Sequence, residues 1–71
     1  MRGMVRMPHD EIERRIVELL RAAPMRQVDI VDAFPGELYI DVGRVVRDMD
    51  ARGLVTRGKC GQTKMVRLNE R

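Results

Sequence analysis

The sequence has few of the side chains on which catalytic and metal sites depend. Its 71 residues include one cysteine, one histidine and no serine. A single thiol, Cys60, cannot close an internal disulfide, and together with His9 it falls short of the ligand number of a structural zinc site. The sequence also has no glycine-rich phosphate loop and no paired catalytic motif. We therefore expect neither enzyme activity nor a bound metal or cofactor.

Aromatic residues and long apolar runs are also scarce. Phe34 and Tyr39 are present but tryptophan is absent, which argues against an aromatic platform for single-stranded bases. No apolar run approaches the roughly 18 residues that cross a bilayer. Residues 1–7 hold Arg2 and Arg6 without a following apolar segment, so a signal peptide is not expected. The sequence thus predicts a cytoplasmic protein with no membrane contact.

The length and composition predict one small globular domain. Hydrophobic residues make up 44% of the chain and charged residues 35%, which is more apolar content than a disordered chain contains. A chain of this length is near the lower limit for one self-sufficient core. We expect residues 8–69 to form the domain. Residues 1–7 are expected to be a flexible basic arm, of a kind that enters a minor groove in some DNA-binding domains.

The positive charge is concentrated near the C-terminus. The formal net charge is +3. Residues 25–53 carry six acids against four arginines, whereas residues 54–71 carry five bases against Glu70 alone. Arginine accounts for twelve of the fourteen basic residues, and its planar guanidinium suits phosphates and guanine edges. This distribution is compatible with an anionic partner that approaches the C-terminal third.

Three helices are predicted from apolar residues that recur every three or four positions. The first, at about 9–22, has its stripe at Ile12, Ile16, Leu19 and Leu20. The second, at about 26–33, has its stripe at Val28, Val31 and Phe34, with Ile30 alongside. A turn at 35–37 separates it from the third, at about 39–52, which carries Val42, Val45, Val46 and Met49. Gly53 should end the third helix in the left-handed conformation.

The last third of the chain changes to the pattern of short strands. Residues 54–57 and 64–68 are predicted strands, and the glycine-containing segment 58–63 is the predicted loop between them. The hairpin should pack on the first and third helices and close the core through Leu54, Val55, Met65 and Leu68, with Val66 as an alternative. The predicted class is therefore α+β, mainly helical with a small β-hairpin.

The stretch Val42-Gly-Arg-Val-Val-Arg-Asp-Met-Asp-Ala-Arg-Gly-Leu-Val-Thr-Arg57 resembles the third helix and first wing strand of winged helix-turn-helix domains. In many regulators of that family, a hydrophobic residue at the end of this helix precedes three mostly polar residues, Gly-Leu-Val or Gly-Leu-Ile, and then a basic residue. The segment 27–33 is similar to the family's second helix, and the resemblance covers about residues 8–68. It implies a three-helix core with a C-terminal wing, in a small bacterial or archaeal transcriptional regulator.

The resemblance also implies a DNA interface. The third helix would enter the major groove, and the wing, at about 54–68, would lie on the adjacent backbone. When the valines of the third helix turn inward, Arg44 and Arg47 share its outer side at i and i+3. The candidate nucleic-acid-binding residues are Tyr39, Gly43, Arg44, Arg47, Arg57, Lys59, Gln62, Thr63 and Lys64.

Each candidate also has a purely structural interpretation. Arg44 and Arg47 could pair with neighbouring acids in a solvated surface network of little energetic value. The basic residues of the wing could simply keep an exposed strand edge soluble. Tyr39 could be half-buried packing, and Gly43 either allows close approach of a ligand or is a tolerated weakness in the helix.

The acidic residues favour an alternative function. Asp41, Asp48 and Asp50 lie in the third helix and would repel phosphates if they faced DNA. The alternative is a protein-interaction winged helix within a larger complex, with an exposed apolar patch around Ile40 and Val45. The expected partners are thus double-stranded DNA, a second copy in a homodimer, or another protein.

Overall fold

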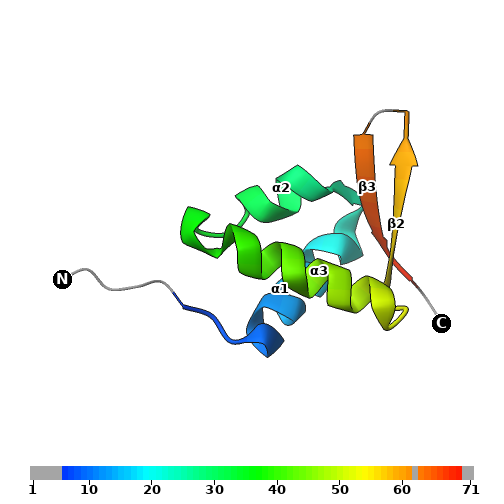
Figure 1. Ribbon diagram of the computed structural model, residues 1–71. Coiled ribbons are helices and arrows are strands. Elements are labelled where there is room, and N and C mark those ends of the chain that lie inside the picture. Colours follow the sequence, from blue (N-terminus) through cyan, green and yellow to red (C-terminus); the bar gives the residue numbers. More distant parts are fainter. Residues whose placement is uncertain (1–5, 62, 70–71) are drawn as a thin grey trace.

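The computed structural model describes residues 6–61 and 63–69, and within them three α-helices and three short strands. Figure 1 shows the helices as one body with the β2–β3 hairpin standing at its edge. In chain order the elements are α1 (His9–Ala22), β1 (Met25–Arg26), α2 (Gln27–Asp32), the 3-10 turn η1 (Gly36–Leu38), α3 (Tyr39–Ala51), β2 (Val55–Cys60) and β3 (Thr63–Leu68). The predicted α+β layout, with a three-helix core and a C-terminal wing, is confirmed.

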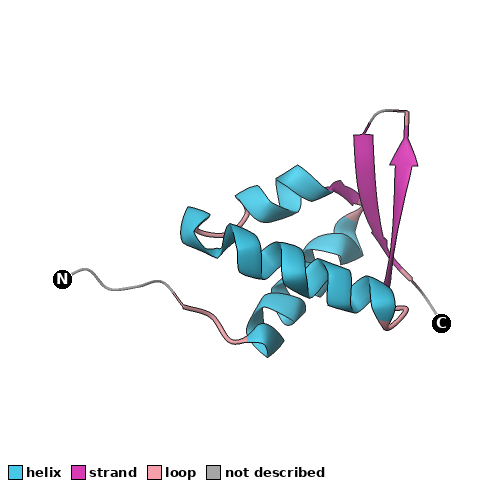
Figure 2. Cartoon of the chain, viewed as in Figure 1, coloured by secondary structure: helices cyan, strands magenta, loops and turns pink. Residues whose placement is uncertain are grey.

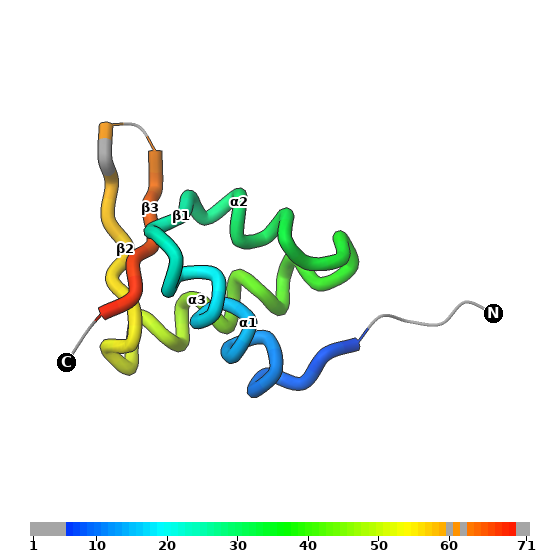
Figure 3. The backbone as a smooth tube through the Cα atoms, turned by 180° about the vertical axis from the view of Figure 1, so that it is seen from behind, coloured from blue at the N-terminus to red at the C-terminus, as the bar shows by residue number. Residues whose placement is uncertain are grey.

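The sheet contains one strand that the sequence did not predict. Its antiparallel order is β1-β3-β2, with Met25 opposite Val66 and Arg26 opposite Met65. Figure 2 shows the strands gathered at one end of the helices, and Figure 3 shows β1 beside β3 from behind. Two residues are too few to show an alternating pattern. The strand exists because β3 offers it a hydrogen-bonding edge.

The hairpin is longer and its loop shorter than predicted. The β2–β3 pairing continues through Gly58 opposite Met65 and Lys59 opposite Lys64, and ends with Cys60 opposite Thr63. The predicted loop at 58–63 is therefore wrong, since all but its tip is paired strand. A glycine inside a strand weakens the strand without ending it, and here the register runs past Gly58. Gln62 lies outside the described residues.

The core is a cluster of apolar side chains from every helix and from the hairpin. The stripes on the first and third helices are confirmed, with Leu19 only partly buried. The buried residues are Ile12, Ile16, Leu20, Ile30, Phe34, Leu38, Val42, Val45, Val46, Met49, Val55 and Val66. No described helix has both the length and the apolar character to cross a membrane.

The second helix buries only part of its predicted stripe. Ile30 and Phe34 are buried at i and i+4, whereas Val28 is 59% exposed and Val31 is only partly buried. The helix has six residues, so two apolar stripes fit the same short sequence and only tertiary packing selects between them. The packing that is chosen buries Ile30 and leaves Val28 on the surface.

The hairpin closes the core through Val55 and Val66 rather than through all the predicted residues. Leu54 is 36% exposed, and Met65 is only partly buried. Successive side chains of a strand point to opposite faces. Val66 and the partly buried Leu68 therefore face the core together, and Met65 lies on the other side of the sheet.

The junction between α3 and β2 is tightly specified. Gly53 has a φ of 80°. The amide of Leu54 donates to the backbone carbonyl of Met49 at 2.9 Å, and the amide of Gly53 donates to the backbone carbonyl of Asp50 at 3.1 Å. These two bonds form a Schellman motif, as expected for glycine after a helix. Asn69 adds a clamp, because its side-chain amide donates to the Gly53 carbonyl at 2.9 Å. The wing is thus held in a fixed position relative to α3.

Candidate nucleic-acid interface

The outward face of α3 is the side opposite its buried residues. Val42, Val45, Val46 and Met49 turn into the core, so Ile40, Arg44 and Arg47 project from the other side, where all three are exposed. Gly43 lies beside them and is partly exposed, and Tyr39 at the start of the helix is 60% exposed. The structure therefore brings four predicted residues onto or beside one exposed surface.

Arg44 and Arg47 do not form the ion pairs that their structural interpretation requires. Within residues 6–61 and 63–69, no salt bridge involves either guanidinium. Two of the three aspartates considered as their partners, Asp48 and Asp50, pair with other basic groups instead. Both exposed guanidinium groups are therefore without an ionic partner among the described residues.

Asp48 belongs to a charge network between α3 and the start of α1. Its Oδ2 lies 3.3 Å from Nε2 of His9 and 2.9 Å from the guanidinium of Arg52, which also donates to Glu13. The hydrogen bond to Glu13 is the main reason that the pKa of Arg52 is raised above its usual value, and the charge of Asp48 adds to it. This acid is turned toward α1 and is balanced by nearby positive charge.

The same network contains the only donor set within the described chain that resembles a metal site. One ligand atom from each of His9, Glu13 and Asp48 lies within 4.8 Å of the others. The guanidinium of Arg52 already bridges the two carboxylates. A metal ion would have to displace it, so the arrangement is better explained as an internal ion-pair network.

Asp50 is neutralised from the wing. Arg57 on β2 donates from Nε to Oδ2 of Asp50 at 3.2 Å, and each side chain is less than half exposed. Arg57 was predicted to contact a phosphate, and the structure shows it exposed and paired with α3, which leaves that prediction untested. One of its five N–H donors serves Asp50.

The two lysines of the wing form an unfavourable pair. Lys59 and Lys64 are exposed and lie directly opposite each other in the β2–β3 ladder. Like charges in this position destabilise a hairpin. Both line a hollow of about 400 Å³ that also includes Gln27, Asp50, Arg57 and Gly58. An anion near this hollow would relieve the repulsion between the two ammonium groups.

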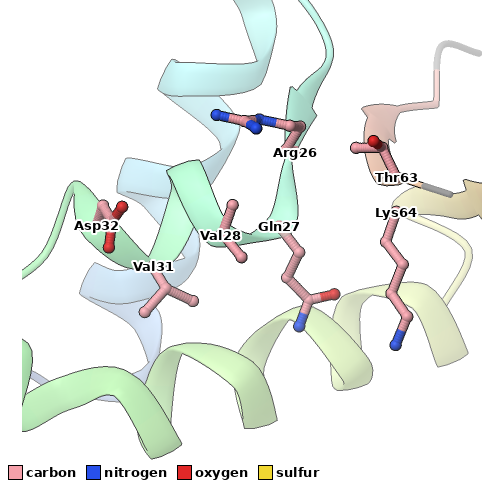
Figure 4. Close-up of a pocket in the computed structure, with 7 residues that line it drawn as sticks. All are labelled: Arg26, Gln27, Val28, Val31, Asp32, Thr63 and Lys64. Carbon is pink, nitrogen blue, oxygen red and sulfur yellow. The ribbon is translucent and has the colours of Figure 1, made fainter.

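A second hollow of about 540 Å³ adjoins the first between α2 and β3. Figure 4 shows Gln27 and Lys64 both extending toward α3, with Val28 and Val31 further along α2. Arg26 at its rim donates to both carboxylate oxygens of Asp29, at 2.8 and 3.0 Å, which lowers the pKa of that carboxyl. Lys64 is thus the lining cation without an ion pair in the described chain, and Thr63 lies beside it.

Sequence reasoning left three residues of this surface out of the predicted interface. Gln27 was assigned only to the second helix, although both hollows include it. Val28 was assigned to the core. Ile40 was considered only as part of a protein-binding patch with Val45, and that patch is wrong in part because Val45 is buried. No signal in the sequence could have placed Gln27 here, because its position depends on β1, a strand too short to be predicted.

Comparison of the chain with protein-family models, with curated proteins and with solved structures finds no match.

Proposed function

We propose that this protein binds double-stranded DNA, with α3 in the major groove and the β2–β3 wing on the neighbouring backbone, as a transcriptional regulator of the winged helix-turn-helix type. The observation that carries this proposal is the state of the charges on α3. Arg44 and Arg47 have no ion pair among the described residues, while Asp48 and Asp50 are each paired with a basic group.

The ion pairs weaken the electrostatic objection to DNA binding. The segment 25–53 carries a net negative charge by sequence, which would repel phosphates. Asp48 is compensated by Arg52, and Asp50 by Arg57. Asp41 is the aspartate of α3 that has no salt bridge in the described chain. It lies in the first turn of the helix, where the helix dipole stabilises a carboxylate.

The dimensions of α3 and the wing also suit a duplex. A helix of thirteen residues is about 20 Å long at about 1.5 Å per residue, and the major groove of B-DNA, about 12 Å wide, admits an α-helix. Lys59 and Lys64 project from the hairpin beside this helix, where a phosphate would neutralise the opposed pair. Gln27 and Thr63 offer further polar groups at the same edge.

A regulator of this size reads few base pairs as one copy. Specific binding by helix-turn-helix proteins commonly uses two copies on half-sites about one helical turn apart. We therefore propose that two copies bind together on DNA. Arg6, which is exposed, and the rest of the arm at 1–7 would add phosphate contacts; residues 1–5 lie outside the described residues.

The second candidate is a protein-interaction module. Val28, Tyr39 and Ile40 are large exposed apolar residues, at 59%, 60% and 55%, and scattered apolar residues of this kind become a docking site when they form one patch. This function requires no affinity for DNA. It predicts that a partner protein, rather than a duplex, changes the environment of these three side chains.

The test is a salt titration of binding to a random-sequence duplex, read by fluorescence anisotropy. Affinity should fall steeply between about 50 and 200 mM salt because phosphate contacts release counterions. The double variant Arg44→Ala/Arg47→Ala should bind at least about tenfold more weakly than wild type. The matched control is Arg14→Ala/Arg21→Ala, which removes the same charge from exposed positions on α1. Equal losses in both variants, or no binding at low salt, would refute the proposal.

A further inference from the structure

Ile40 is an exposed hydrophobic residue in the middle of a polar surface. Its side chain is 55% exposed on the outward face of α3. Residues three and four apart are neighbours on a helix, so Gly43 and Arg44 lie one turn after Ile40, and Arg47 lies one turn further along the same face. An isolated exposed isoleucine is common on protein surfaces and requires no function. The residue beside it provides the second observation.

Gly43 leaves an open gap between Ile40 and Arg47. A Cβ atom built at Gly43 would meet nothing within 4 Å in the described chain, so internal packing does not require glycine there. A glycine inside a helix is about 1 kcal/mol less favourable than alanine. The missing side chain allows an external group to reach the helix backbone next to Ile40, and a base edge in the major groove is such a group.

We infer that Ile40 recognises the methyl group of a thymine, and that it determines sequence specificity at one position of the DNA site. The inference rests on the proposed function. Thymine is the base that presents an apolar group in the major groove, and aliphatic side chains contact it there. Arg44 and Arg47 carry no apolar surface at their tips and suit guanine edges or phosphates instead.

The helix geometry places this thymine relative to the arginine contacts. Ile40 and Arg44 are four residues apart, about 6 Å along the helix axis at about 1.5 Å per residue. Base pairs repeat about every 3.4 Å along each strand. The thymine should therefore lie about two base steps from the group that Arg44 contacts, and Gly43 should face the step between them.

The experiment uses the duplex that the wild-type protein enriches from a random-sequence library. Each thymine of that duplex is replaced in turn by deoxyuridine, which removes only the methyl group. One replacement should weaken wild-type binding by about fourfold, the value for burying one such carbon. Ile40→Ala should bind the original duplex about as weakly, and the same replacement should then have no further effect. Leu54→Ala, which shortens an exposed aliphatic residue that precedes β2 and lies outside the proposed interface, should keep the full fourfold penalty.

The outcomes separate this inference from the proposed function. If wild-type binding falls with salt but no deoxyuridine replacement weakens it, or if Ile40→Ala retains the penalty, the thymine contact is refuted while DNA binding stands. If the library yields no enriched duplex and the protein has no affinity for DNA, both are refuted. A loss of the penalty in Ile40→Ala but also in Leu54→Ala would refute the assignment to Ile40.

Discussion

Arg57 on the first wing strand donates a hydrogen bond to Asp50 near the end of α3, with 3.2 Å between Nε and Oδ2. The pair joins the two elements that are proposed to contact DNA. In the proposed complex, the pair also compensates an acid that would lie near the phosphate backbone. The negative charge of Asp50 is therefore compensated only while Arg57 is present.

This relationship predicts that removing both partners harms DNA binding less than removing Arg57 alone. Arg57→Ala leaves Asp50 uncompensated at the interface, so affinity should fall by about tenfold. In Asp50→Asn/Arg57→Ala, most of that loss should be recovered because no unpaired carboxylate remains. Thermal unfolding should change little in either variant, since exposed ion pairs contribute about 1 kcal/mol or less. A double variant that binds more weakly than Arg57→Ala would show that Asp50 does not oppose binding.

Gly43→Ala should change stability and DNA affinity in opposite directions. The new methyl group meets no atom within 4 Å in the described chain, so the variant should gain up to about 1 kcal/mol of stability. The melting temperature should rise by a few degrees, as that gain implies for a domain of roughly this size. Affinity for the selected duplex should fall because the helix backbone no longer reaches the base edges. Unchanged affinity in the stabilised variant would mean that nothing approaches Gly43 closely.

A substitution at the lysines of the wing should also change stability and DNA affinity in opposite directions. In Lys59→Glu the side chain opposite Lys64 becomes a favourable cross-strand partner, which should stabilise the hairpin by about 0.2 to 1 kcal/mol. DNA affinity should fall, and its dependence on salt should become weaker because a phosphate contact is lost. Lys59→Gln serves as the neutral control and should be intermediate in both measurements. Stronger DNA binding by Lys59→Glu would exclude the wing from the interface.

The Arg26–Asp29 pair at the start of α2 should make stability depend on acid pH. The hydrogen bonds from Arg26 hold the pKa of Asp29 below its usual value. Because the folded-state pKa is lowered, the stabilisation is fully present above the ordinary aspartate pKa of 3.8 and is lost as pH falls through the folded-state value. The melting temperature of wild type should therefore decrease in this acid range more than that of Asp29→Asn. Parallel curves for the two proteins would show that the pair does not stabilise the fold.

The sequence predicts the elements whose causes are local. The end of α3 follows from Gly53 and from the stripe that finishes at Met49, and α1 follows from a long apolar repeat. The two strands of the hairpin were found, but their lengths were not, because pairing beyond Gly58 depends on the partner strand. The choice between Val28 and Ile30 for burial also depended on neighbours that are distant in sequence.

The ion pairs of the candidate site also depend on residues that are distant in sequence, and so could not be predicted. The exposed position of Arg44 and Arg47 could be predicted from helical spacing alone. The partner of Asp48 could not, because His9 is 39 residues away and Arg52 bridges two helices. Asp48 was therefore counted against DNA binding until the fold showed that it faces α1 and not the outward surface.

The most direct test of the central claim is a backbone amide chemical-shift map of the protein with a short duplex at low salt. We predict that the largest shifts lie at Ile40, Gly43, Arg44 and Arg47 on α3 and at Lys59 and Lys64 on the wing, with little change on the outward face of α1. The same amides should return toward their free positions as salt is added. Shifts centred on α1, or an unchanged spectrum at low salt, would contradict the account.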